Sequence, residues 1–175
     1  MHGISVPVII LLYIIQIKKM KQIFLVVALF ATIFVEQAIA QDSTRSESSL
    51  LSSYYNLKNA LVSSNAEAAS AGATAFVKAI DAAGKETVND STRKVLLADA
   101  GAIAETKDLK VQRVKFATLS ANMFALAKVV KLSTAPVYQQ YCPMKKASWL
   151  SDNKAIKNPY YGSAMLTCGS VKETL

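Results

Sequence analysis

The chain has 175 residues, a formal net charge of +8 and one histidine, His2, which lies in a segment with the pattern of an export signal. The rest of the chain therefore lacks imidazole, which excludes Ser-His and Cys-His catalysis and removes the commonest ligand of zinc, non-haem iron and Cu(II). Because the chain also has no Gly-rich phosphate loop and its basic residues are scattered, we expect neither an enzyme nor a nucleic acid binder.

Residues 1–40 account for the export pattern. Met20 and Lys21 open a short basic start, an apolar run covers 23–35, and Ala38 and Ala40 form a small-x-small cleavage site. We expect translation to start at Met20, cleavage to follow Ala40, and the mature protein to be periplasmic or secreted without a stable membrane span. The alternative, an N-terminal anchor, would need the apolar run 6–17, which is short for a span. The mature chain has 20 − 3 = 17 basic and 12 − 1 = 11 acidic residues.

Residues 41–49 are polar and rich in serine, which predicts a flexible leader. Beyond them, apolar residues recur at helical spacing in four stretches joined by short links. The four predicted stripes are Leu50, Tyr54, Leu57, Leu61; Ala69, Ala73, Phe76, Ile80, Ala83; Leu96, Ala100, Ile103; and Phe116, Leu119, Met123, Leu126, Val130. The pattern predicts an all-α fold, an antiparallel four-helix bundle, within a single domain over residues 50–175.

The chain changes character after Leu132. Both cysteines, the only tryptophan, four tyrosines and every proline beyond Pro7 lie in this last part. We expect residues 136–175 to form a Cys-, Met- and Tyr-rich segment packed on the bundle. A short β-hairpin between 137–141 and 165–168 is the alternative to wholly irregular structure. Arg113 on the fourth helix is expected to anchor this segment by donating to its carbonyl groups.

Each cysteine has a methionine close by. Cys142 precedes Met144 by two positions, and Cys168 follows Met165 by three. Folding the segment back on itself would gather four sulfurs, a ligand set that selects Cu(I) or Ag(I) over hard cations. Trp149 is then a candidate cap over the ion, since aromatic faces attract cations.

A Cys142–Cys168 disulfide is the alternative use of the two thiols. Two cysteines in an exported protein pair by default. Closing the loop between them would stabilise the fold by about 3.5 kcal/mol in the chain-entropy model. The residues leave both uses open, and a pair that binds Cu(I) when reduced and forms a disulfide when oxidised would combine them.

Several motifs of the chain carry a resemblance to a known family: Tyr54–Val62, Gln112–Arg113 with Phe116 and Leu119–Ser120, Tyr141–Met144, Trp149–Ser151, and Asn158–Tyr160 through Cys168–Gly169. Over nearly all of residues 50–175 the chain resembles a bacterial domain family of unknown function. That family is common in secreted proteins of the Bacteroidetes and is also appended to HlyD/CusB-type membrane-fusion subunits of copper and silver efflux pumps. The resemblance implies an efflux-pump membrane-fusion protein, or another envelope protein that handles copper, as the partner.

Two hypotheses follow for the function. The first is a periplasmic Cu(I) or Ag(I) binding module for heavy-metal efflux or copper homeostasis, with Cys142, Met144, Met165 and Cys168 as ligands. The second is a helical protein-interaction domain of the cell envelope that is stapled by the Cys142–Cys168 disulfide and binds no metal.

Overall fold

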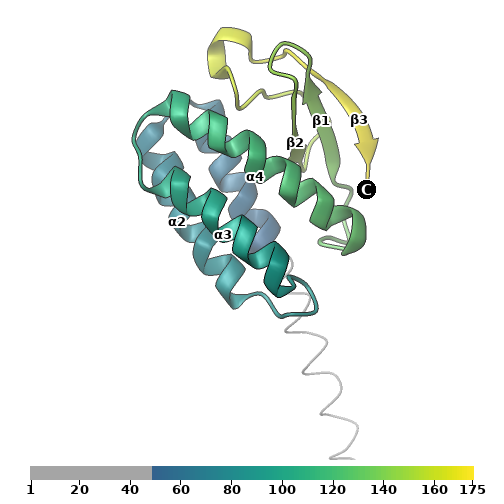
Figure 1. The fold of residues 1–175 in the computed structure, drawn as a ribbon. Helices are drawn as coiled ribbons and strands as arrows, with labels where there is room; N and C mark the ends of the chain where they lie inside the picture. The colour runs from purple at the N-terminus through teal and green to yellow at the C-terminus, as the bar shows by residue number, and fades with distance from the viewer. Residues whose placement is uncertain (1–48) are drawn as a thin grey trace, which may run out of the picture. The chain divides into compact units, whose positions relative to one another are not determined.

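Four helices and a small antiparallel sheet make up the part of the chain that the computed structural model describes, residues 49–175. The expected export signal, its cleavage site after Ala40 and the leader up to residue 48 lie outside the described residues. The elements are a first helix over 49–62, α2 (Ala66–Ala82), α3 (Asp90–Ala104), α4 (Leu109–Val129), β1 (Tyr138–Cys142), β2 (Ala147–Ser151), the 3-10 helix η1 (Gly162–Met165) and β3 (Ser170–Thr174) (Figure 1). Within the described range, no helix is both long enough and apolar enough to span a membrane.

The three labelled helices begin at short polar side chains that cap their free N–H groups. The carboxamide oxygens of Asn65 and Asn89 accept from the amides three residues later, and the Asp108 carboxylate accepts from the N–H of Lys110. Such caps each stabilise a helix by about 1 kcal/mol. The guanidinium of Arg93 donates to the carbonyl groups of Ile80, Ala83 and Val88, so it ties the end of α2 to the start of α3.

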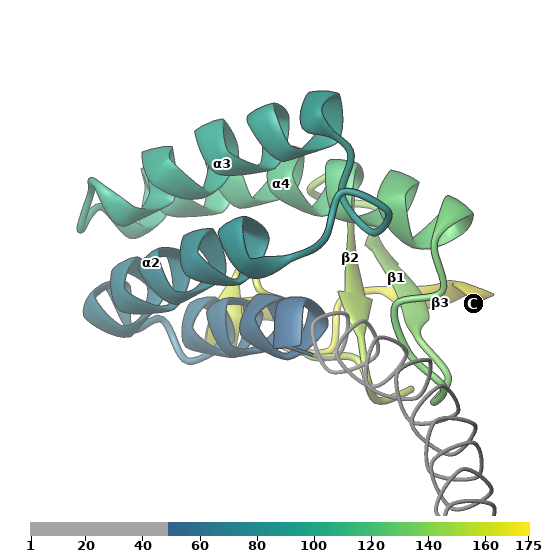
Figure 2. The same cartoon turned by 90° about the horizontal axis from the view of Figure 1, so that it is seen from below.

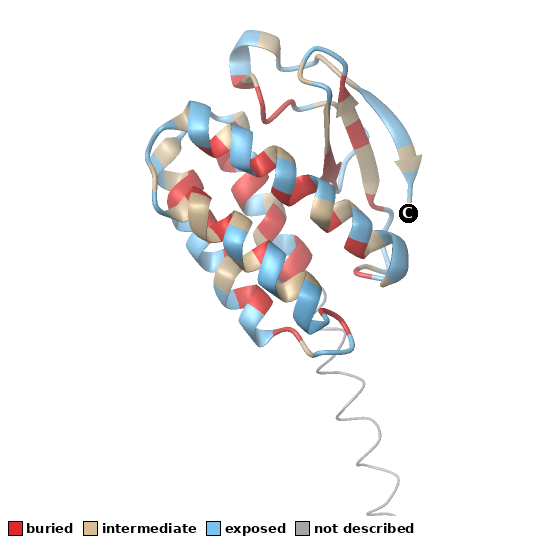
Figure 3. Ribbon diagram, viewed as in Figure 1, coloured by how far each residue is buried: buried red, intermediate tan, exposed pale blue. Residues whose placement is uncertain are grey.

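The helical bundle is confirmed, and the predicted stripes are buried in its core except for Val130, which is only partly buried. Figure 2 shows α3 and α4 as one layer, with α2 and the first helix as the other. Figure 3 shows buried residues on all four helices and on β1 and β2, and together they form one core cluster. Leu57, Phe76, Leu96 and Phe116 are fully buried, one from each helix. Met123, the methionine of the α4 stripe, is also fully buried.

The C-terminal segment differs from the expectation, because it holds a three-stranded sheet of order β2-β1-β3. β1 pairs antiparallel with β2 across the four-residue turn 143–146, with Cys142 opposite Ala147. β1 also pairs antiparallel with β3, which begins after Cys168. The predicted strand near 165–168 is therefore wrong, and the all-α description holds only for the bundle. Residues 162–165 form the 3-10 helix η1 instead, so the strand that returns to β1 begins only at Ser170.

Strand β2 joins the sheet to the bundle. The Tyr54 hydroxyl, fully buried on the first helix, lies 2.7 Å from the Ser120 hydroxyl on α4 and accepts from the N–H of Leu150 at 3.0 Å. The Phe116 ring stacks on Tyr54, with 5.5 Å between centroids, and contacts Tyr160 at 6.0 Å. Helices and sheet thus share one core, which fixes the position of the loops at the far end of the sheet.

Candidate metal centre

The two cysteines come together, as the metal hypothesis requires. Their Sγ atoms lie 3.5 Å apart and are not bonded. Cys142 is fully buried, whereas Cys168 is only partly buried. The pair thus joins a fully buried cysteine to a partly exposed one.

The hairpin turn 143–146 positions Cys142 and stabilises its thiolate. Lys146 closes the turn in the left-handed conformation, with a φ of 55°, and the N–H of Lys145 donates to Cys142 Sγ at 3.4 Å. Burial would raise the pKa of Cys142, but hydrogen bonds, chiefly from Lys145, outweigh burial, and the net pKa is lowered. The hydrogen bond with Cys142 raises the pKa of Cys168. The hydrogen bonds of the turn therefore favour the thiolate form of Cys142, and the Cys142 contact disfavours that of Cys168.

The buried Asn158 positions Cys168. Its side-chain N–H donates to the carbonyl of Cys168, its backbone N–H donates to the carbonyl of Leu166, and its side-chain oxygen accepts from Tyr160 N, all at 2.8 Å. From the sequence, Asn158 was noted only as part of a motif that carries the family resemblance. Asparagine favours such local bonds to the backbone, but nothing near it in the sequence indicated this role.

Arg113 anchors the same loop to the bundle, as predicted. Its Nε atom donates to the carbonyl of Pro159 at 3.0 Å, and one terminal nitrogen donates to the carbonyl of Leu61 and the hydroxyl of Ser64. Gly162 lies against this cluster with a φ of 58°, and a Cβ atom there would lie 2.8 Å from the guanidinium. Only glycine fits this approach without strain.

Met144 and Met165, the predicted neutral ligands, are less buried than Cys142. Met144 is in the hairpin turn with 65% of its surface exposed. Met165, at the end of η1, is partly buried, and its carbonyl accepts from Cys168 N at 3.1 Å. Each methionine is close in the chain to its cysteine, and an unbranched thioether is flexible. Their role as ligands stays a prediction.

Trp149 belongs to the core. It is 1% exposed and meets Tyr160 edge to face at 5.9 Å. A Cβ atom at Gly169 would lie 3.0 Å from its ring, so the ring touches the residue that follows Cys168. The role of Trp149 as a cap over an ion stays a prediction.

The described residues contain no cluster of the usual ligands for zinc or calcium. Nowhere in residues 49–175 do three or more His, Cys, Asp or Glu side chains gather in a way that would hold a metal ion. The usual zinc and calcium sites need such a group. Two thiolates with neutral thioethers suit a soft monovalent ion instead.

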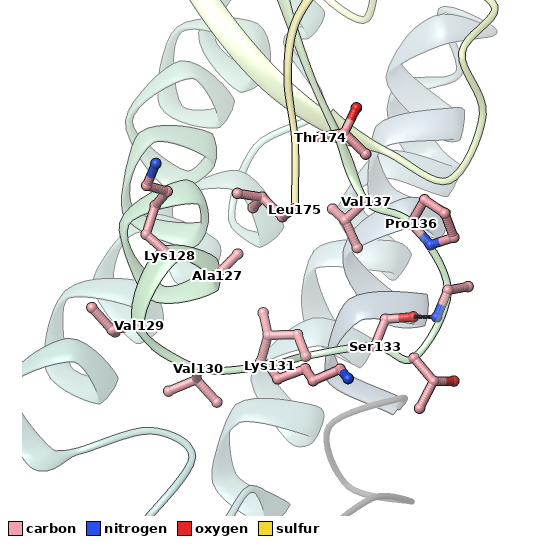
Figure 4. A pocket seen from close by; sticks show the side chains of 13 residues that line it. Ala127, Lys128, Val129, Val130, Lys131, Ser133, Pro136, Val137, Thr174 and Leu175 are labelled. Atoms are coloured by element: carbon pink, nitrogen blue, oxygen red, sulfur yellow. Dashed lines mark hydrogen bonds between the residues drawn. The ribbon is translucent and has the colours of Figure 1, made fainter.

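A pocket of about 540 Å³ lies away from the thiols. The end of α4, residues 130–136 and the residues Val137, Thr174 and Leu175 line it (Figure 4). It adjoins the start of β1, whereas Cys142 ends that strand. The pocket therefore belongs to a different part of the surface from the thiol pair.

No sequence pattern predicted that Lys58 would be buried. In the fold it lies between the first helix and the end of β2. Its side chain is 4% exposed, and Nζ lies 3.5 Å from the hydroxyl of Ser151 and 3.7 Å from the carboxylate of Asp152. Burial lowers the pKa of Lys58, and Asp152 opposes that shift only in part. A buried ammonium with two distant partners disfavours folding.

Lys58→Met is therefore expected to stabilise the protein by about 1 kcal/mol at pH 7, because Asp152 remains solvated. The folded-state pKa lies below the unfolded value, so the unfolded chain binds more protons between the two. Wild-type stability then rises with pH across that window, and the advantage of the variant shrinks toward pH 10. Urea unfolding of both proteins at pH 7 and pH 10 measures this. An advantage that is the same at both pH values would contradict it.

A known protein family matches the helices of this chain but not its sheet. Residues 50–135 match a family described as "Protein of unknown function (DUF3347)". This helical part is a domain of unknown function. The match to the DUF3347 family ends before β1, so both cysteines lie outside the matched stretch. No curated protein and no solved structure matches the chain.

Proposed function

We propose that the protein binds Cu(I) or Ag(I) between Cys142 and Cys168 and serves copper homeostasis or heavy-metal efflux in the cell envelope. The observation that carries this proposal is the pair of unbonded thiols 3.5 Å apart, one of them buried and hydrogen-bonded by a backbone amide. Soft sulfur ligands favour these ions over the hard cations that are more abundant in water.

The distance between the sulfurs brings both within reach of one ion. At 3.5 Å they are in contact without a bond. A disulfide needs about 2.05 Å, so the sulfurs would have to approach by roughly 1.5 Å. An ion between them would move them apart instead, because two sulfurs about 2.3 Å from a metal lie about 3.8 Å apart at a tetrahedral angle and farther apart as the angle opens.

The directions of the two pKa shifts also support a bound ion over thiol exchange. Attack on a disulfide requires a thiolate that the other molecule can reach. Here hydrogen bonds lower the pKa of the buried Cys142, whereas the pKa of the partly buried Cys168 is raised. The thiolate that the fold favours is therefore the buried one, which would attract a cation.

The disulfide-stapled interaction domain is the second candidate, because the same short distance also suits oxidation. Labelling anaerobically purified protein with a thiol-blocking reagent, followed by mass spectrometry, counts its free thiols. Competition of the reduced protein with a Cu(I) chelator then measures metal binding. We expect two labelled thiols and one ion per chain. A complete Cys142–Cys168 bond that persists in mild reductant would rule out thiolate ligation.

The proposed location and partner rest on other features. The pattern of residues 20–40 supports export. The efflux-pump membrane-fusion protein, or another copper-handling envelope protein, is proposed as the partner from the motif resemblance. Mass determination of the mature N-terminus after expression in a bacterium tests export, and a start at Met20 or earlier would contradict it.

The double substitution Met144→Leu with Met165→Leu tests the thioethers. We expect Cu(I) affinity to fall about tenfold, in the range for loss of groups that support a metal site. Thermal stability should stay unchanged, because Leu replaces Met at nearly equal volume and Met144 is mostly exposed. Chelator competition and a thermal melt measure the two quantities. Unchanged affinity would show that the thioethers only pack.

A further inference from the structure

We infer that the end of the sheet bearing the thiols docks an acidic protein surface that carries its own sulfur ligands. The inference rests on the proposed function, since the partner's ligands would receive or deliver the ion. Three features of this end carry it: its charge, its exposed apolar side chains and the single accessible sulfur.

The positive charge at this end has no counterpart within the fold. Residues 136–175 contain five lysines and two acidic residues, Asp152 and Glu173. Both acids are engaged elsewhere, with Lys58 and Lys128. None of the five lysines forms an ion pair with any residue in the described range. An acidic surface is the complement that this charge attracts.

Three of these lysines, the lysine rim, lie at the end of the sheet where Cys142 ends β1. Lys145 and Lys146 lie in the turn that follows Cys142. Lys172 lies near the start of β3, with Nζ 5.6 Å from the ring centroid of Tyr141, the residue before Cys142. The lysine rim thus places charge beside the metal site, where it would steer a partner's approach.

Exposed apolar side chains flank the same site. Met144 is 65% exposed and Leu166 is 38% exposed. Each lies two residues from one of the paired cysteines. An apolar centre inside a charged rim is the usual anatomy of a protein interface.

Access to the ion is one-sided, because Cys142 is buried and Cys168 is not. A partner thiol would therefore reach the ion from the Cys168 side. Each metal–sulfur bond that forms on the partner replaces one that breaks here. The proton that the partner thiol gives up passes to the thiolate left behind, so charge and atoms balance.

The test uses two synthetic peptides with the same Cys-Gly-Gly-Cys centre, one flanked by two glutamates on each side and the other by two lysines. Protein loaded with Ag(I) is mixed with each peptide at low salt, and transfer is followed by the fluorescence of Trp149, the only tryptophan. We expect transfer to the acidic peptide to be at least about tenfold faster, and the difference to shrink at high salt.

Charge reversal identifies the surface. Lys145→Glu with Lys146→Glu should slow transfer to the acidic peptide about tenfold and speed transfer to the basic one. Lys78→Glu with Lys94→Glu is the matched control, since both lysines are exposed on α2 and α3 and the net charge changes equally. The control should stay within about twofold of wild type.

The outcomes separate the inference from the proposed function. The docking surface is wrong, and the metal site stands, if wild type binds Ag(I) but transfers it equally fast to both peptides. The same conclusion follows if the control variant slows transfer to the acidic peptide as much as the rim variant does. If wild type binds no Ag(I) in chelator competition, both fall. Binding to phosphatidylserine vesicles without preference for the acidic peptide would assign the lysine rim to a membrane surface and overturn the inference.

Discussion

Replacing Cys142 and Cys168 together with serine will lower the Ag(I) or Cu(I) affinity by more than about a hundredfold. Loss of groups that only support a metal site costs about 10- to 100-fold, so loss of both anionic ligands should exceed that range. A hydroxyl does not ionise near neutral pH and is a hard donor. Competition against a chelator of known affinity measures the change.

The two single variants separate the sulfurs. Cys168→Ser should weaken binding while sparing stability, because Cys168 is only partly buried. Cys142→Ser should weaken binding and also lower stability, since it buries a hydroxyl in place of a fully enclosed thiol. Met123→Leu removes a buried sulfur from the α4 core and is the matched control. An affinity of the double serine variant within threefold of wild type would disprove the metal centre.

Phe116→Ala will lower the free energy of unfolding by about 3–5 kcal/mol, more than any other substitution predicted for this protein. Its fully buried ring lies between Tyr54 of the first helix and Tyr160 of the loop that leads to Cys168. The substitution leaves a cavity where helices and sheet meet, so the support of that loop should weaken and metal affinity should fall as well. Urea unfolding measures the first effect and chelator competition the second.

Val114→Ala on the same helix is the control for Phe116→Ala. Val114 is 51% exposed and should change stability by less than about 0.5 kcal/mol. If both variants lose the same stability, the aromatic contacts do not join the sheet to the bundle. If Phe116→Ala loses stability but binds the ion normally, the thiol loop folds independently of that core.

The helices could be predicted because their signal is local. Leu50, Tyr54, Leu57 and Leu61 recur at steps of three and four, and all four are fully buried. An amphipathic helix shows its buried face in any short window of sequence. Arg113 was also predictable, since a guanidinium beside a Pro- and Gly-containing loop has carbonyl groups to bind.

Of the sheet, the strand predicted at 137–141 corresponds to β1, but its partners were not predicted. The hairpin turn contains no Asn-Gly or Asp-Gly pair and instead places Lys146 in the left-handed region, which residues other than glycine seldom adopt. Strand β3 is mostly exposed and shows no alternation of buried and exposed residues. The register of such a strand is set by its partner, so only the folded chain reveals it.

The amino-acid sequence alone determined the number of helices, their inward faces and the presence of two thiols with adjacent methionines, because these features depend on spacing along the chain. Only the tertiary structure decided that Cys142 and Cys168 meet, that Cys142 is the buried member and that Lys58 lies in the interior. Those outcomes depend on contacts between segments far apart in sequence. The decisive contacts are the bonds of Asn158 and Arg113 and the pairing of β1, and no short window of sequence contains them.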